Sequence, residues 1–301
     1  MANIELLKKL REMTQAGVTD AMKALNENNQ DLDKAVQWLR EKGIAKAAKK
    51  ANAIATEGIS KVIIRDNLAI IYEVNCETDF VAANESFTSL VDDIGLTLLE
   101  SGENDFEKAL QLKLPSRMTI EESCKELTGK IGEKIGLRRY EILSKDKKHM
   151  FSSYQHTNKK IAVLLTINNN VDVNVAKDIA MHAAAMAPKY LNQGKMDKVW
   201  LENEIKIIKE QMASDEKFVG MMKDPSMNSR VEGIVKGKVN RLLSEVTLEA
   251  QAFVKDPSKT VKQYINSVKA DVIDYVRYQV GEGIEKKIVD FVAEVNAQMK
   301  K

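Results

Sequence analysis

The chain has 301 residues, 44% of them hydrophobic and 30% charged, which is the composition of a globular protein of two or three domains. Because 46 Lys and Arg residues nearly balance 44 Asp and Glu residues, the formal charge of +2 argues against capture of nucleic acid by the whole chain. No apolar run approaches the roughly 20 residues that span a bilayer, and the start, Met1 to Glu5, lacks the regions of a signal peptide, so we expect a cytoplasmic protein without a membrane segment.

Residues 4–42 are predicted to form three short helices. The second follows a turn at Gly17, and the third begins at the cap candidate Asp31, after which apolar residues recur at helical spacing. We expect Gly43 to end the third helix. Residues 45–51 then read as a helical tether with a cationic side, for which a solvated linker is favoured over a nucleic-acid contact.

From Ile59 the hydrophobic period changes to two, which predicts a strand hairpin with its turn at Asp66-Asn67. A helix is predicted after the next junction from a stripe of apolar residues, namely Phe87, Leu90, Val91, Ile94 and Leu98. Residues 120–135 are predicted to be helical, and residues 139–143 to form a third strand.

The same pattern then recurs. Residues 150–156 and 160–167 predict a second hairpin, and the helix that follows carries a stripe made of Val175, Ile179, His182 and Met186. A lone histidine on such a stripe is more often a packed residue than a ligand. Two copies of hairpin, loop and helix predict a duplicated α+β core with antiparallel sheets.

Beyond Pro188 the helical period returns in two segments. Their apolar residues step by four and three, as in a coiled coil; they are Leu201, Ile205, Ile208 and Met212, then Val235, Val239, Leu242 and Val246. Because Asp224-Pro225-Ser226 breaks the run, an antiparallel hairpin is predicted. An amphipathic helix over Val261–Tyr278, a break at Gly281-Glu282-Gly283 and a last helix through Val292 complete the prediction.

The motifs of common catalytic and cofactor sites are missing from the sequence. It has no phosphate-binding glycine loop, no histidines at metal-ligand spacing and no nucleophile elbow, so we expect no cofactor and no metal. Cys76 and Cys124 form no Cys-x-x-Cys pair and are expected to be buried thiols. Glu77 and Asp79 could in principle act as an acid and base pair, but two such acids near a strand end are common and unspecific.

The junction after residue 76 places Asp79 and Phe80 side by side between a strand and a helix. A phenylalanine in this polar stretch either folds back under the next helix or stays exposed for a partner. The hydrophobic pattern alone favours packing of Phe80 onto Phe87 or Leu90.

Several motifs resemble those of the bacterial elongation factor Ts family. They are Leu10-Arg11-Glu12-x-Thr14-x-Ala16-Gly17, Ala45-x-x-Ala48-Lys49-Lys50-Ala51, Glu73-Val74-Asn75-Cys76-x-Thr78-Asp79-Phe80-Val81-Ala82, Ser153-Tyr154-Gln155-His156, Ile179-Ala180-Met181-His182, Pro257-Ser258-Lys259-Thr260-Val261 and Val280-Gly281-Glu282-Gly283. They follow the family's order and together cover nearly the whole chain. The Thr-Asp-Phe-Val run is highly specific to that family.

The resemblance implies a guanine-nucleotide exchange factor that binds the GTPase elongation factor Tu and catalyses no covalent chemistry. In the family, an Asp-Phe tip enters the nucleotide domain of the GTPase and disturbs its magnesium site. That role is implied here for Asp79 and Phe80, with Thr78 and Val81 setting the loop.

The resemblance also implies other contacts with the same partner. These are expected at Arg11, Gly17, Val18, Thr19 and His182. The family commonly has two methionines after the glycine and a cysteine after the aspartate, where this chain has Val18, Thr19 and Ala21. No direct nucleic-acid or membrane contact is implied.

The patterns and the resemblance together give an expected α+β fold with five parts. These are an N-terminal three-helix (UBA-like) bundle at 1–43, a helical tether at 44–58, a first core copy at 59–145, a second core copy at 146–258 with an inserted antiparallel coiled-coil hairpin at about 195–248, and a C-terminal helical module at 259–301.

Two other classes of function fit parts of the sequence. A nucleic-acid or ribosome-binding module would use basic residues, namely Lys46, Lys49, Lys50, Arg138 and Arg139, but the aromatic residues of such a surface are missing. A metal-assisted hydrolase would use Glu77 and Asp79, but the sequence has no supporting cluster of ligands.

Overall fold

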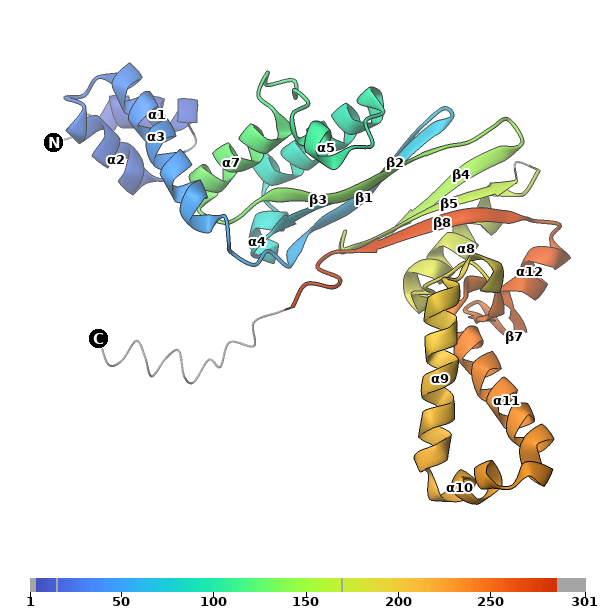
Figure 1. Ribbon diagram of the computed structural model, residues 1–301. Coiled ribbons are helices and arrows are strands. Elements are labelled where there is room, and N and C mark those ends of the chain that lie inside the picture. Colours follow the sequence, from blue (N-terminus) through green and yellow to red (C-terminus); the bar gives the residue numbers. More distant parts are fainter. Residues whose placement is uncertain (1–3, 15, 169, 286–301) are drawn as a thin grey trace. The chain divides into compact units, whose positions relative to one another are not determined.

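The computed structural model describes residues 4–14, 16–168 and 170–285. The chain separates into two compact units (Figure 1), which we describe one at a time. Unit 1 comprises Met1–Ser144, Gln155–Ala162 and Tyr278–Lys301, and unit 2 comprises Lys145–Tyr154 and Val163–Arg277. Helices and antiparallel strands occur in the same chain, which confirms the α+β class.

Unit 1 begins with three helices, as predicted: α1 (Ile4–Thr14), α2 (Val18–Glu27) and α3 (Leu32–Lys50). They enclose a small apolar cluster made of Leu10, Ala21, Ala24, Leu25 and Ala35. Asp31 caps α3 by accepting a hydrogen bond from the backbone N–H of Lys34, which confirms the predicted start of that helix.

The prediction that Gly43 ends the third helix is wrong, because α3 continues through it to Lys50. Gly43 instead lies against Gly129 of α7 (Ile120–Ile131). A Cβ atom on Gly129 would lie 2.6 Å from the Cα of Gly43, far inside van der Waals contact. The glycine therefore permits a close helix crossing, and residues 44–50 of the predicted tether belong to the third helix.

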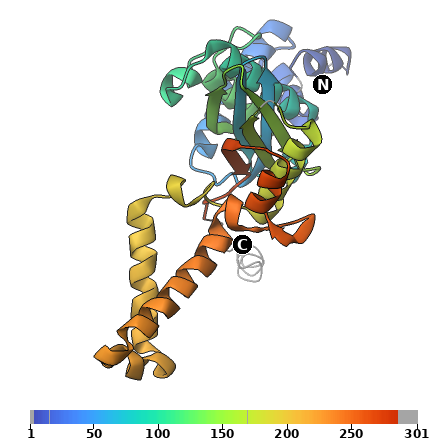
Figure 2. The same cartoon turned by 90° about the vertical axis from the view of Figure 1, so that its right-hand side faces the viewer.

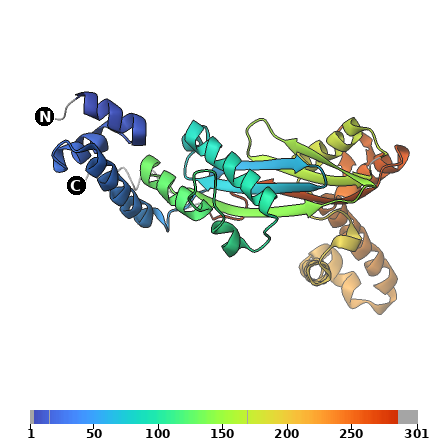
Figure 3. The ribbon, with the colours of Figure 1, turned by 90° about the horizontal axis from the view of Figure 1, so that it is seen from above.

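The predicted strands of the first core copy are confirmed. β1 (Glu57–Arg65), β2 (Leu68–Cys76) and β3 (Gly136–Ser144) form an antiparallel sheet in that order, and Asp66 makes the turn with a positive φ of 53°. One face of the sheet is covered by helices (Figure 3), chiefly α5 (Glu85–Ser101) and α7, with the shorter α4 (Asp79–Ala82) and α6 (Phe106–Leu110). The predicted stripe from Phe87 to Leu98 is buried in this core.

A second three-stranded sheet has the order β4–β5–β8 and is built from β4 (His149–Gln155), β5 (Ile161–Asn168) and β8 (Val272–Gln279). The predicted hairpin is thus confirmed, and α8 (Val173–Met186) follows it. In α8, Ile179 and His182 are buried, whereas Met186 is 46% exposed.

The predicted helix over Val261–Tyr278 is wrong in its second half. α12 (Val261–Ser267) ends early, Lys269 turns the chain with a φ of 52°, and β8 follows. The β8 segment is rich in β-branched and aromatic residues, which favour a strand when a neighbouring strand is available. The predicted last helix through Val292 extends into residues 286–301, outside the described part of the chain.

Two long helices of unit 2, α9 (Lys198–Ser214) and α11 (Asn228–Val246), fold back on one another through α10 (Glu216–Lys223). Figure 2 shows the two helices as separate rods that meet at the end where α10 joins them. Of the two predicted seams, Met212 and Val235 are buried and the other residues are half-buried. A hairpin is therefore present, and coiled-coil packing along its length stays a prediction. The unit also contains three short 3-10 helices and two short strands. The 3-10 helices are Gln193–Lys195, Pro225–Met227 and Leu248–Ala250, and the strands are β6 (Ala252–Phe253) and β7 (Asp256–Thr260).

Within the described ranges, no helix combines the length and the apolar character needed to cross a membrane.

Candidate functional site

The predicted tip lies where β2 passes into α4. Thr78 is the N-cap of α4, and its Oγ1 accepts a hydrogen bond from the backbone N–H of Val81 at 3.4 Å. The thiol of Cys76 donates to the carbonyl of Thr78 at 3.1 Å. Asn84 then caps α5 by accepting from the N–H of Ser86, so the chain turns sharply on both sides of α4.

The ring of Phe80 is 85% exposed, and Asp79 beside it is also exposed. Packing of Phe80 under the next helix, which the hydrophobic pattern favoured, is therefore wrong. Val81 takes the inward position instead and is only 7% exposed. Successive residues of a helix point about 100° apart, so burying Val81 turns Phe80 outward.

A neighbouring loop, residues 132–135 between α7 and β3, holds the base of the tip. The carboxylate of Glu133 accepts two hydrogen bonds from Thr78, one from its N–H at 2.9 Å and one from its hydroxyl at 2.8 Å. Glu77 accepts from the N–H of Lys134 at 2.7 Å and pairs with Lys50 of α3 at 2.9 Å. Sequence reasoning missed these partners because they lie 27 to 57 residues from the tip along the chain.

These contacts bear on the acid and base pair considered from the sequence. Both oxygens of Glu77 serve structural contacts, while Asp79 is exposed to solvent. No group of three or more possible metal ligands occurs among the residues that the structure describes. Cys76 and Cys124 are free and buried as predicted, and burial raises the pKa of each thiol to about 12. The turn between β2 and α4 thus exposes Asp79 and Phe80, and hydrogen bonds with residues 133 and 134 hold its base.

The predicted contacts of the N-terminal bundle lie at the junction of α1 and α2. Arg11 donates from Nε to the carbonyl of Ala16 at 3.3 Å, and Gly17 is the N-cap of α2. Val18 and Thr19 are exposed. Two apolar residues that sequence reasoning missed, Met13 and Met22, are also exposed nearby in sequence, at 54% and 41%.

His182, in unit 2, is fully buried. Its Nδ1 accepts from the backbone N–H of Val254 at 3.1 Å, so Nε2 carries the proton and lies 3.0 Å from Oε1 of Gln251. Burial lowers the pKa of the imidazole, and the hydrogen bond to Gln251 opposes this shift only in part. The ring is therefore a neutral, packed group that supports the exposed Val254, as the pattern of a lone histidine indicated.

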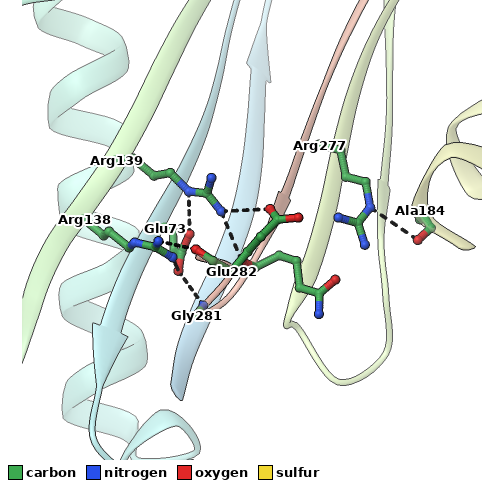
Figure 4. Close-up of polar contacts among 8 residues, drawn as sticks. Glu73, Arg138, Arg139, Ala184, Arg277, Gly281 and Glu282 are labelled. Carbon is green, nitrogen blue, oxygen red and sulfur yellow. Dashed lines mark hydrogen bonds and ion pairs between the residues drawn. The ribbon is translucent and has the colours of Figure 1, made fainter. Parts of the chain in front are cut away.

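Most cations of the proposed basic surface are engaged by acids. Lys46 pairs with Asp20, and Lys50 with Glu77. Figure 4 shows that Arg138 and Arg139 both bind the buried carboxylate of Glu73, at 2.9 Å and 2.6 Å. These ion pairs reduce the charge available to a phosphate backbone.

The same close-up shows Glu73 accepting a hydrogen bond from the N–H of Gly281 at 2.9 Å, while Arg138 and Arg139 contact Glu282. Arg139 also lies over the ring of Tyr278, 4.2 Å from its centre. The buried carboxylate therefore joins β2, β3 and residues 278–282 of unit 1.

Comparison with known proteins gives one consistent answer. Residues 77–282, more than half of the chain, match the family described as "Elongation factor TS". The chain is also 44% identical over 296 residues to a protein of Acholeplasma laidlawii (strain PG-8A) named "Elongation factor Ts", and the match covers 98% of each.

Proposed function

The chain belongs to the elongation factor Ts family, and we propose that it is a guanine-nucleotide exchange factor for elongation factor Tu. It binds the GTPase and promotes release of GDP, so that GTP can bind again during translation elongation in the cytoplasm. One observation supports this best: the side chain of Phe80 is 85% exposed, although it lies in the short helix that directly follows β2, a strand that is buried at every residue except its first. Large exposed rings on a rigid support are typical of protein interfaces.

In this proposal, Asp79 and Phe80 enter the nucleotide domain of the partner, and Thr78 and Val81 fix the corner that presents them. A magnesium ion bridges the phosphates of a bound nucleotide and the protein, and it is among the largest local charges in such a site. Displacing the elements that support the ion therefore lowers the affinity of the GTPase for GDP, and the dissociation of GDP accelerates. The factor itself makes and breaks no covalent bond.

Thermodynamic linkage explains why such a factor can cycle. Whatever free energy of coupling weakens GDP binding in the presence of the factor weakens factor binding equally in the presence of nucleotide. An incoming nucleotide therefore displaces the factor. The exchange needs no energy source beyond the nucleotide concentrations.

Further contacts are proposed on both units. On unit 1, a second surface for the partner is proposed at the junction of α1 and α2, made by Arg11, Gly17, Val18 and Thr19. The exposed Met13 and Met22 extend this surface. On unit 2, the proposed contact is made by the backbone and the exposed Val254 next to His182, because the imidazole itself is buried.

The test is the release of labelled GDP from purified elongation factor Tu, with and without this chain. We expect wild type to accelerate release and Phe80→Ala to lose about thirtyfold of that effect, since truncation of an interface anchor costs about 2 kcal/mol or more. Ile64→Ala is the matched control, because Ile64 is 41% exposed but lies at the other end of the β1–β2 hairpin. Failure of wild type to accelerate release contradicts the proposed function.

A further inference from the structure

Phe80 has little packing of its own to hold it in place. α4 has four residues, far fewer than a helix needs to be stable alone, and its cap hydrogen bond is long at 3.4 Å. Burial of Val81 turns Phe80 away from the core, and the ring itself is 85% exposed. Any finer control of the direction in which Phe80 points must therefore come from a contact outside α4.

The carboxylate of Glu133 makes such a contact. Its two oxygens accept from the N–H and from the hydroxyl of Thr78, at 2.9 Å and 2.8 Å. Hydrogen bonds to an ionised acceptor are roughly twice as strong as neutral ones, and two of them together fix an orientation as well as a distance. Both the backbone and the side chain of the N-cap residue are thus held from the loop between α7 and β3.

A second contact joins the same two segments, with donor and acceptor exchanged between them. The N–H of Lys134 donates to Glu77 at 2.7 Å, and the other oxygen of Glu77 pairs with Lys50. Adjacent residues of one segment therefore bind adjacent residues of the other, through both carboxylates. This reciprocal arrangement resists twisting of the corner more than a single hydrogen bond does.

We propose that Glu133 is a positioning residue for nucleotide exchange: through Thr78, it sets the orientation of Phe80. The inference rests on the proposed function of the tip. We expect Glu133→Ala to lower the maximal rate of GDP release, at saturating factor, by about tenfold, which is the effect of about 1.4 kcal/mol. Glu133→Gln should keep most of the rate, because the amide oxygen can accept from the N–H of Thr78 and the amide nitrogen can donate to its hydroxyl.

The readout separates positioning from folding. Release of labelled GDP from elongation factor Tu is measured over a range of factor concentrations, giving a maximal rate and a half-saturating concentration. Partial unfolding raises the half-saturating concentration and leaves the maximal rate unchanged, whereas misdirection of the ring lowers the maximal rate. Glu126→Ala is the matched control, since Glu126 is also on this part of the chain, in α7, but pairs at the surface with Lys130.

A double variant tests whether the effect passes through the ring. If Glu133 acts by orienting Phe80, then Phe80→Ala with Glu133→Ala should be no slower than Phe80→Ala alone. Independent, additive losses overturn the inference. A wild-type maximal rate for Glu133→Ala, beside a clear loss for Phe80→Ala, also overturns it and leaves the proposed function intact.

If Glu133→Ala does not fold, Glu133→Asp carries the test, because it keeps the charge and withdraws the carboxylate from Thr78 by the length of one methylene group. A lowered maximal rate for Glu133→Asp supports the positioning role, and an unchanged rate contradicts it. If wild type itself does not accelerate release, the proposed function has failed, and the positioning role fails with it.

Discussion

The buried carboxylate of Glu73 accepts a hydrogen bond from the backbone N–H of Gly281, which lies 208 residues later in the chain. Two arginines, Arg138 and Arg139, bind the same carboxylate. Gly281 has a positive φ of 76°, and a Cβ there would lie 2.4 Å from the carbonyl oxygen of Thr56. The segment that follows β8 can therefore approach β1 and β2 this closely only with glycine at this position.

We expect Glu73→Ala to lower the free energy of unfolding by about 2–3 kcal/mol, because it removes the buried carboxylate that two arginines and the partly buried N–H of Gly281 share. This is below the largest losses for buried pairs, since both arginines retain some contact with water. Urea denaturation measures the change. Glu100→Ala, which removes an exposed pair with Arg65, is the control and should cost less than about 1 kcal/mol.

Opposite effects are predicted for Gly→Ala changes at two helical glycines, one at the α3–α7 crossing and one on an open face of α11. Gly129→Ala should destabilise by about 1–3 kcal/mol, because its methyl group would overlap the backbone of Gly43. Gly237→Ala on α11 should stabilise by about 0.5–1 kcal/mol, since nothing lies within 4 Å of a Cβ there and alanine favours a helix. Thermal and urea unfolding of both variants would expose an error if the two shifts had the same sign.

Two phenylalanines close in sequence should behave differently. Phe87 is fully buried, so Phe87→Ala should cost about 3–5 kcal/mol of unfolding free energy. Phe80→Ala should change it by less than about 0.5 kcal/mol, because the ring is 85% exposed. A large loss of stability in Phe80→Ala would mean that the ring packs within the chain in solution.

His182 should make stability depend on pH. Burial lowers the pKa of its imidazole in the folded chain, while the unfolded chain has the ordinary value of about 6.5. Above that pH both states are neutral; below it the unfolded state binds a proton that the folded state does not, so stability falls as the pH falls. The loss reaches at most about 1.4 kcal/mol per pH unit.

Urea midpoints measured between about pH 7.5 and about pH 5.5 test this dependence. The slope should be shallower in His182→Gln than in wild type. Equal slopes for wild type and His182→Gln would show that another group titrates.

The two cysteines predict slow thiol chemistry. Burial raises the pKa of Cys76 and of Cys124 to about 12, so almost no thiolate is present at neutral pH. A disulfide reagent that absorbs on reaction should modify both residues quickly in urea and only slowly in the folded chain. Rapid reaction of one thiol without denaturant would place it at the surface.

The sequence by itself determined the elements whose information is local. The stripe from Phe87 to Leu98, the hairpin turn at Asp66 and the cap at Asp31 were predictable, because the spacing of apolar residues and the chemistry of a cap depend on neighbours in the chain. The change of hydrophobic pattern located the junction at Thr78 to Val81, but only the resemblance to a family indicated that Phe80 is kept exposed for a partner.

Tertiary structure decided what depends on distant partners. The helix runs through Gly43 because Gly129 approaches it, and residues 272–279 form a strand because they join the sheet of β4 and β5. Val81 and not Phe80 faces inward, and Glu133 holds the corner from 55 residues away. A one-dimensional pattern records which residues are apolar, but which of them is buried, and which carboxylate meets which N–H, follows only when separate segments pack together.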